Sequence, residues 1–176
     1  MIGMQKIIER IASQLDSEYD IVVKGSTSTA VASASRDIFA RREVALDPDH
    51  QSVLLSLGGF WFNGFTFFPP ESHTEMTYAN GRYRINESRG LLEENEDYWA
   101  PDLGIDDLVF ASDEGYAYAY NTKEAGYKFY RRLIEEPHID RTYDCFAKSM
   151  LDGLDRADLD VKDLAPNHFV FSSQLP

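Results

Sequence analysis

Side chains that could do chemistry are few in this sequence, and carboxylates are the only abundant kind. Four of them flank one apolar run: Asp106 and Asp107 precede it, and Asp113 and Glu114 follow it. Two-metal hydrolases hold their metal ions with such clusters, so metal-assisted hydrolysis is one function to consider. Neither lysine nor histidine accompanies these acids, whereas a catalytic site normally combines them with other polar groups. We therefore keep hydrolysis as the alternative, and expect no catalytic residue, no metal and no other cofactor.

Other motifs of reactive sites are incomplete. The four histidines are scattered, and a single cysteine, Cys145, cannot form a cysteine-based zinc site. His73 and Glu75 match the His-x-Glu of nucleobase deaminases, but the Pro-Cys-x-x-Cys that completes that site is absent. Residues 25–29 lack the Gly-Lys-Ser/Thr end of a phosphate-binding loop. Cys145 stands beside Phe146 on an apolar helical face, which favours a buried thiol over a nucleophile.

The charge of the chain excludes two classes of partner. The sequence has 17 basic and 30 acidic side chains, a formal net charge of −13. Nucleic-acid binding needs cations that neutralise phosphates, and an anionic membrane surface repels an acidic protein. No apolar stretch approaches the length of a membrane span, and the first residues lack the apolar core of a secretory signal. Together with the single cysteine, these features predict a cytoplasmic protein that binds neither nucleic acid nor membrane.

The negative charge is concentrated in one segment. Residues 90–122 contain no lysine or arginine but nine carboxylates, among them Glu93, Glu94 and Glu96. This pattern allows two interpretations, a solvated acidic face that confers solubility or a surface that attracts a basic partner.

The elements that position these residues follow from hydrophobic periodicity. Asp47-Pro48 predicts the start of a helix that Gly58-Gly59 ends, and Asn63-Gly64 and Asn80-Gly81 predict tight turns between strands. Further helices are expected at 3–16, 36–43, 88–98 and 141–154, with a loop at 25–35. Strands are expected at 19–24, 60–63, 65–68, 74–78, 82–85, 107–112, 116–120, 127–133 and 168–172.

This order of elements predicts one α+β domain over residues 1–176. Its mostly antiparallel, twisted sheet should have about five or six strands, with helices packed on one face.

A row of tyrosines suggests how the domain binds. Tyrosines alternate with Ala117 and Ala119 between residues 116 and 120, which predicts one face of rings and one of alanines. We expect the alanines to face a covering helix and the tyrosines to line a half-exposed groove beside carboxylates, as in many protein interfaces. The predicted partner-binding surface comprises Asp106, Asp107, Asp113, Glu114, Tyr116, Tyr118 and Tyr120, with Glu93, Glu94 and Glu96 as a rim that steers the partner.

Three segments within residues 46–154 together resemble one known family. They are Leu57-Gly58-Gly59-Phe60-Trp61-Phe62-Asn63-Gly64-Phe65, residues 107–120, and Cys145-Phe146-x-x-Ser149-Met150-Leu151. In this order they resemble the helix end and hairpin, the central strand, turn and strand, and the closing helix of the SUKH superfamily, in particular of its YrhA-like branch. The chain departs from the family's Leu-Pro-x-x-Tyr, having Leu46-Asp47-Pro48-Asp49-His50 instead.

The resemblance implies a function without catalysis. Many bacterial members of this family are immunity proteins that neutralise polymorphic toxins, often nucleases; fungal members act as regulatory scaffolds, and the family shares no catalytic residues. A nuclease must be basic where it meets phosphate, so an acidic inhibitor suits that surface. We therefore expect a non-enzymatic, immunity-type protein whose partner is a basic toxin domain. Besides the hydrolase, the alternative is a structural or scaffold protein of a mobile element; the sequence leaves the oligomeric state open.

Overall fold

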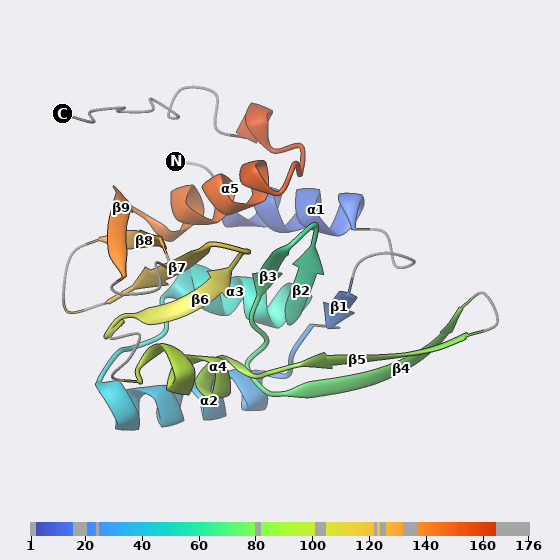
Figure 1. Ribbon diagram of the computed structural model, residues 1–176, viewed down its shortest axis with the longest axis horizontal. Helices are drawn as coiled ribbons and strands as arrows, with labels where there is room; N and C mark the ends of the chain where they lie inside the picture. Colours follow the sequence, from blue (N-terminus) through green and yellow to red (C-terminus); the bar gives the residue numbers. More distant parts are fainter. Residues whose placement is uncertain are drawn as a thin grey trace.

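One antiparallel sheet of seven strands forms the centre of the fold (Figure 1). The computed structural model describes residues 3–15, 21–23, 25–79, 82–100, 105–121, 123, 126–131 and 137–164; for 21–23, 75–79, 82–86 and 162 it describes the backbone alone. Across the sheet the order is β1 (Ile21–Val23), β2 (Gly59–Phe62), β3 (Phe65–Phe67), β6 (Leu108–Ser112), β7 (Tyr116–Tyr120), β8 (Tyr127–Arg131) and β9 (His138–Tyr143).

The predicted α+β class is confirmed, and the sheet exceeds the expected five or six strands. The additional strand is β9, which occupies the first residues of the helix predicted over 141–154. That helix, α5 (Phe146–Arg156), begins only after the strand has paired with β8. Residues 138–143 lack the alternation of polar and apolar residues that predicts a half-buried strand, which explains the error.

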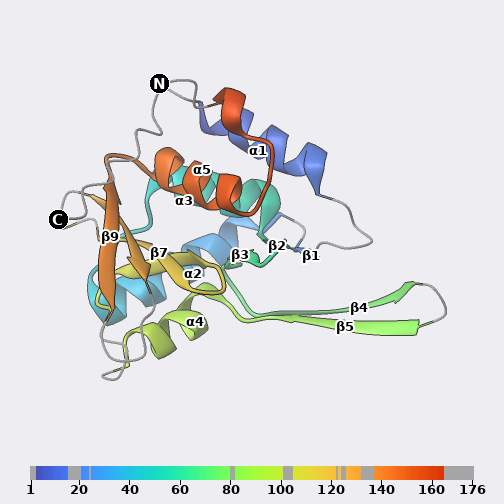
Figure 2. The same ribbon diagram turned by 45° about the horizontal axis from the view of Figure 1, so that its top comes forward.

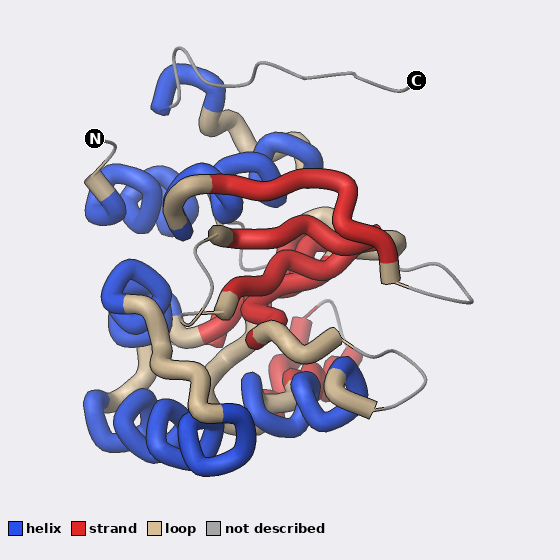
Figure 3. Tube along the Cα trace, turned by 90° about the vertical axis from the view of Figure 1, so that its left-hand side faces the viewer, coloured by secondary structure: helices blue, strands red, loops and turns tan. Residues whose placement is uncertain are grey.

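Helices lie on both sides of this sheet, which corrects the prediction that they pack on one face (Figures 2 and 3). α3 (Pro48–Leu57) and α5 pack against the face that bears the tyrosines of β7, and α1 (Met4–Gln14) packs on both helices. α2 (Ser28–Arg42) and α4 (Leu91–Tyr98) lie together beside β6, and a single turn, η1 (Lys162–Leu164), follows α5. None of the helices in the described part of the chain has the length and apolar character that crossing a membrane requires.

Several local signals in the sequence act as expected. Asp47 caps α3 by accepting hydrogen bonds from the backbone N–H groups of Asp49 and His50, and Pro48 occupies its first turn. Asn63 and Gly64 both have positive φ, 44° and 88°, which is the tight turn predicted between β2 and β3. The predicted Asn80-Gly81 turn and the strand at 168–172 lie outside the described residues.

The loop predicted over 25–35 is wrong, because α2 already begins at Ser28. The hydroxyl of Thr27 caps this helix by accepting from the N–H of Ala30. The serines and threonines that suggested a loop supply this cap, and the alanines that follow favour helix. α4, in turn, begins at Leu91 rather than Ser88, because β5 runs as far as Ser88.

The side chain of Asn95 continues the sheet where β3 ends. β3 pairs with β6 only as far as Phe67, and the backbone of Val109 lies beyond that point. The amide of Asn95, fully buried on α4, accepts from Val109 N–H at 2.8 Å and donates to Val109 C=O at 2.7 Å. This side chain therefore takes the position of a paired strand and holds α4 at the edge of β6.

A separate hairpin extends from the body of the molecule (Figures 1 and 2). It consists of β4 (His73–Ala79) and β5 (Arg82–Ser88), which pair with each other and with none of the seven strands of the main sheet. We call it the arm. Its two ends join the body at Ser72 and Arg89, next to α4.

Candidate functional site

The predicted tyrosine row is buried in the core, which corrects the expected binding surface. Tyr118 and Tyr120 are 0% and 1% exposed, because β7 is an inner strand and its tyrosine face lies under α3 and α5. Only Tyr116, at the end of the strand, is half-buried; its ring stacks on Phe129, and the guanidinium of Arg156 lies 4.3 Å from its centre. Tyr118 and Tyr120 therefore cannot contact a partner from the surface of the folded chain.

The buried tyrosine hydroxyls are hydrogen-bonded, which allows them to lie inside. Tyr118 donates to a carboxylate oxygen of Asp113 at 3.1 Å. Tyr120 accepts from the backbone N–H of Asp47 at 3.0 Å and lies 2.9 Å from Nδ1 of His50. Burial is the main cause that raises the pKa of both tyrosines well above the ordinary value. These phenols are thus neutral structural groups.

His50 completes this network in the core. Nδ1 of His50 and the Tyr120 hydroxyl share one hydrogen bond, in which either group can donate, and Nε2 has no partner among the described residues. The ring is wholly buried and stacks on Phe146 at 5.3 Å. Burial lowers the pKa of His50 to about 3, so the imidazole is neutral at physiological pH. A neutral histidine enclosed by aromatic rings serves packing rather than catalysis.

The four carboxylates around β6 do not form one cluster. Asp106 and Asp107 lie at its start, whereas Asp113 and Glu114 lie beyond its end, and five extended residues span about 17 Å. Within the described residues, no group of three or more histidine, cysteine or acidic side chains could hold a metal ion. The described residues therefore do not contain the cluster of carboxylates that the hydrolase alternative needs.

Each of these carboxylates has different surroundings. Asp107 is 3% exposed, and its Oδ2 lies 2.9 Å from Lys128 Nζ and accepts from the hydroxyl of Tyr130, so it leaves the predicted contact surface. Asp106, in contrast, is exposed and pairs with Arg42 at 3.2 Å. Asp113 bonds Tyr118 and lies 3.5 Å from Arg156, and Glu114 is exposed. Asp106, Glu114 and half-buried Asp113 thus remain available to a partner.

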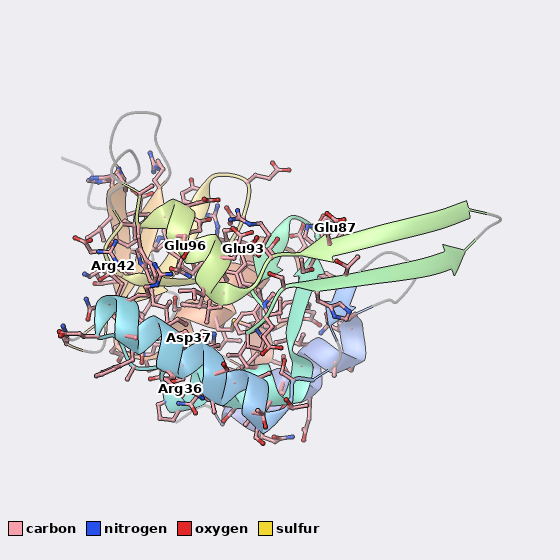
Figure 4. The ribbon with its side chains drawn as sticks, turned by 90° about the horizontal axis from the view of Figure 1, so that it is seen from below. Arg36, Asp37, Arg42, Glu87, Glu93 and Glu96 are labelled. Carbon is pink, nitrogen blue, oxygen red and sulfur yellow. The ribbon has the colours of Figure 1, made fainter. Side chains whose placement is uncertain are left out.

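An acidic groove lies at the base of the arm, between α2 and α4. Its volume is about 280 Å³. Four carboxylates line it, and Figure 4 shows Asp37 on α2 with Glu93 and Glu96 on α4. The lining residues are Ser33, Ala34, Asp37, Pro70, Glu71, Ser72, Gly90, Leu92, Glu93 and Glu96. We call this surface the acidic groove; it contains two of the three glutamates predicted as the steering rim.

Hydrogen bonds fix one wall of the acidic groove. The hydroxyl of Ser72 donates to Glu93 and accepts from the backbone N–H of Gly90 at 2.9 Å, which ties the start of the arm to α4. The bond from Ser72 is the main cause that lowers the pKa of Glu93, so this carboxylate is ionised at neutral pH. Gly90 has no room for a side chain, since a Cβ would lie 2.7 Å from the backbone nitrogen of Ser72.

Arginines approach the acidic groove only from outside its lining. Arg41 lies 3.3 Å from Glu96, and Arg89 lies 3.6 Å from Glu93 and also pairs with Asp97. These pairs are exposed to solvent and compensate part of the negative charge. The third predicted rim residue, Glu94, is half-buried and lies 3.9 Å from Arg89.

Asp37 and Glu71 belong to the acidic groove but were not predicted from the sequence. They lie far from residues 90–122, where the acidic residues are dense, and only the fold brings them together. Asp37 lies within the helix predicted over 36–43, but no local signal placed this helix opposite α4.

Comparison with known proteins gives no relative. No protein-family description, no curated protein and no solved structure matches this chain.

Proposed function

We propose that this protein is a non-enzymatic, acidic binding protein that neutralises a basic toxin domain by covering its surface, as the resemblance to SUKH immunity proteins implies. The observation that supports the proposal is the acidic groove, whose lining among the described residues contains four carboxylates and no lysine or arginine. A basic side chain of a partner that entered it would meet negative charge from α2, from α4 and from the base of the arm.

Charge explains the speed of such binding better than its strength. A net charge of −13 attracts a basic partner over distance and can raise the association rate by about 10–10³. Exposed ion pairs, however, contribute only about 0–1 kcal/mol each, so apolar contacts have to slow dissociation. With Tyr118 and Tyr120 in the core, Phe39 on α2 and Trp61 on β2, 54% and 38% exposed, become the candidates for these contacts.

The test is binding and rescue with the toxin domain encoded next to this protein. We expect the chain to bind that domain, to restore growth of cells that express it, and to bind more slowly as the salt concentration rises. Asp37→Lys combined with Glu96→Lys should weaken binding at least tenfold. Glu9→Lys, on α1 at the opposite side of the molecule, is a control with half that change in charge and should bind like the wild type.

Two results would contradict the proposal. One is absence of both binding and rescue; the other is unchanged affinity of the acidic-groove variant. If the chain bound no toxin and formed a stable homo-oligomer, the scaffold alternative would be favoured instead.

A further inference from the structure

The arm lacks a partner within the described part of the chain. Its two strands form a sheet of their own, and in Figures 1, 2 and 4 it extends beyond the helices and the main sheet. A two-stranded hairpin alone in water is at best marginally stable, because it has no second layer that covers its apolar residues. An arm of two seven-residue strands therefore calls for a surface that packs against it.

The register of the arm puts its apolar residues on one face. Met76 is paired with Ile85, and Tyr78 with Tyr83. Residues directly opposite in an antiparallel pair share a face, as do residues two positions apart, so these four positions lie together. The other face has the pairs Glu75–Asn86, Thr77–Arg84 and Ala79–Arg82. The arm is therefore amphipathic, like a strand pair that packs on one side.

Charge changes sign along the arm. Glu71 and Glu87, both exposed, lie at its base, where the acidic groove adds Glu93. The only arginines or lysines between residues 71 and 88 are Arg82 and Arg84, at the far end of the hairpin. Arg89 also lies at the base, where it pairs with Glu93 and Asp97, so the base keeps an acidic excess and the far end is basic.

From this placement we propose that the arm is a dimerisation element whose occupant is the arm of a second copy of this chain. The two arms lie antiparallel about a twofold axis with their apolar faces together. Such an interface is isologous, so each arm presents to the other the same surface that it receives. The two arginines at the end of each arm then lie at the acidic base of the other.

The dimensions agree with this arrangement. Seven extended residues span about 20 Å or more, so two fully overlapping arms bring each far end to the opposite base. Both chains have a net charge of −13, but charges in solvent are screened beyond about 8 Å at physiological ionic strength. The attraction between the base of one arm and the far end of the other acts at contact distance, so salt weakens it less than it weakens the repulsion between the two chains.

Charge also selects a second copy over other partners. A basic protein would be attracted to the base of the arm and repelled by Arg82 and Arg84. An acidic protein would be attracted to these arginines and repelled by the base. The arm of a second copy, lying antiparallel, presents positive charge to the base and negative charge to the far end. This inference does not depend on the proposed toxin binding, but both use Glu71 and Glu93, so a dimer and a toxin complex would compete for these carboxylates.

The experiment measures mass in solution by sedimentation and light scattering between about 1 µM and 1 mM, the affinity range expected of a small interface. The wild type should approach twice the 20.1 kDa of one chain as its concentration rises. Arg82→Glu with Arg84→Glu gives a chain with an acidic far end, and Glu71→Arg with Glu87→Arg gives one with a basic base. Each variant alone should remain a monomer, because the base of one arm and the far end of the other then have charges of the same sign.

Mixing the two variants is the decisive step, because both contacts between base and far end become complementary in a heterodimer. We expect the two variants to bind each other at least tenfold more tightly than either variant binds itself. Lys6→Glu with Arg36→Glu, two exposed positions on α1 and α2, makes the same change in charge elsewhere and should dimerise like the wild type. Circular dichroism verifies folding of every chain. If a charge variant fails to fold, Met76→Asp, which alters only the apolar face, replaces it and must lower the dimer fraction.

A wild type that stays monomeric throughout would overturn the inference. So would variants that dimerise like the wild type, or a mixture that stays monomeric. None of these results bears on toxin binding, which the acidic-groove variant and its Glu9→Lys control test separately.

Discussion

At the scale of single residues, burial decides what a titratable group can do. His50 is neutral because its ring lies among Phe67, Phe110, Phe146 and Tyr120, where a charge would lose its hydration. Asp107, by contrast, has the cation of Lys128 and the hydroxyl of Tyr130 beside it. Of the two, Asp107 was a candidate metal-binding carboxylate in the sequence, and the fold buries both residues.

His50 makes stability depend on pH. Its pKa is about 3 when folded and near 6.5 when unfolded, so below pH 6.5 the unfolded chain binds a proton that the folded chain does not. The free energy of unfolding should therefore fall by about 1.4 kcal/mol for each pH unit between 6.5 and 3 on account of this residue. Urea denaturation at pH 7, 5.5 and 4.5 measures this slope. His50→Gln, which does not titrate, should lose stability less steeply, and parallel curves would contradict the assignment.

Asn95 gives a second prediction at this scale. Replacing it with leucine, similar in volume, leaves the N–H and C=O of Val109 buried without partners. Because each such group costs about 1–3 kcal/mol, Asn95→Leu should lower the free energy of unfolding by about 3 kcal/mol. Asn121→Ala is the control: it removes an exposed amide that accepts from Lys123 N–H, and should cost below about 1 kcal/mol. Equal effects in thermal or urea unfolding would show that Asn95 does not complete the sheet.

What the sequence reveals at this scale is residue type, not surroundings. The alternation of Tyr116, Tyr118 and Tyr120 correctly predicts a strand, yet it cannot tell which face the helices cover. The amide of Asn95 resembles any polar residue on an acidic helix until β3 is known to end early. Local spacing thus predicts the strand, whereas burial depends on contacts between segments far apart in the chain.

At the scale of elements, turn and cap residues were the reliable signals. Asp47-Pro48 and Asn63-Gly64 set the start of α3 and the turn between β2 and β3, because both act through their own backbone. The errors at α2 and β9 occurred where composition was used in place of such a signal. The arm was found as a hairpin, but its separation from the main sheet depends on the whole topology.

Gly153 shows how closely α5 approaches the sheet. Glycine inside a helix usually costs about 1 kcal/mol relative to alanine, so Gly153→Ala should stabilise an isolated helix. Here an added Cβ would lie 2.4 Å from a ring carbon of Phe65, which is itself fully buried. We expect Gly153→Ala to lower the free energy of unfolding by about 1–3 kcal/mol. Gly115→Ala, with nothing within 4 Å of the added Cβ, is the control and should be nearly neutral.

Combining the substitution with a smaller ring partner sharpens this prediction. Phe65→Leu removes the atoms that the new methyl group would meet, so the double variant should be more stable than the sum of the two single effects predicts. Strict additivity in urea denaturation would mean that α5 does not pack on β3 at Gly153.

At the scale of the whole molecule, excess negative charge works against the compact state. Folding brings 30 acidic and 17 basic side chains together, and their net repulsion is long-ranged. The same charge that attracts a basic toxin thus lowers stability. The ion pairs at the surface, such as Arg41–Glu96 and Lys123–Glu43, are exposed and compensate little of it.

Salt should therefore stabilise this protein. Raising NaCl from about 10 mM to 1 M shortens the screening length from about 30 Å to 3 Å, which removes repulsion between distant carboxylates more than attraction within contacts. The thermal midpoint should rise over this range at pH 7. In a variant with Glu71→Lys and Glu114→Lys, two exposed positions, each replacement raises the net charge by two units. Its midpoint should start higher in low salt and rise less, whereas an equal salt response of both proteins would show that local ion pairs, not net charge, govern stability.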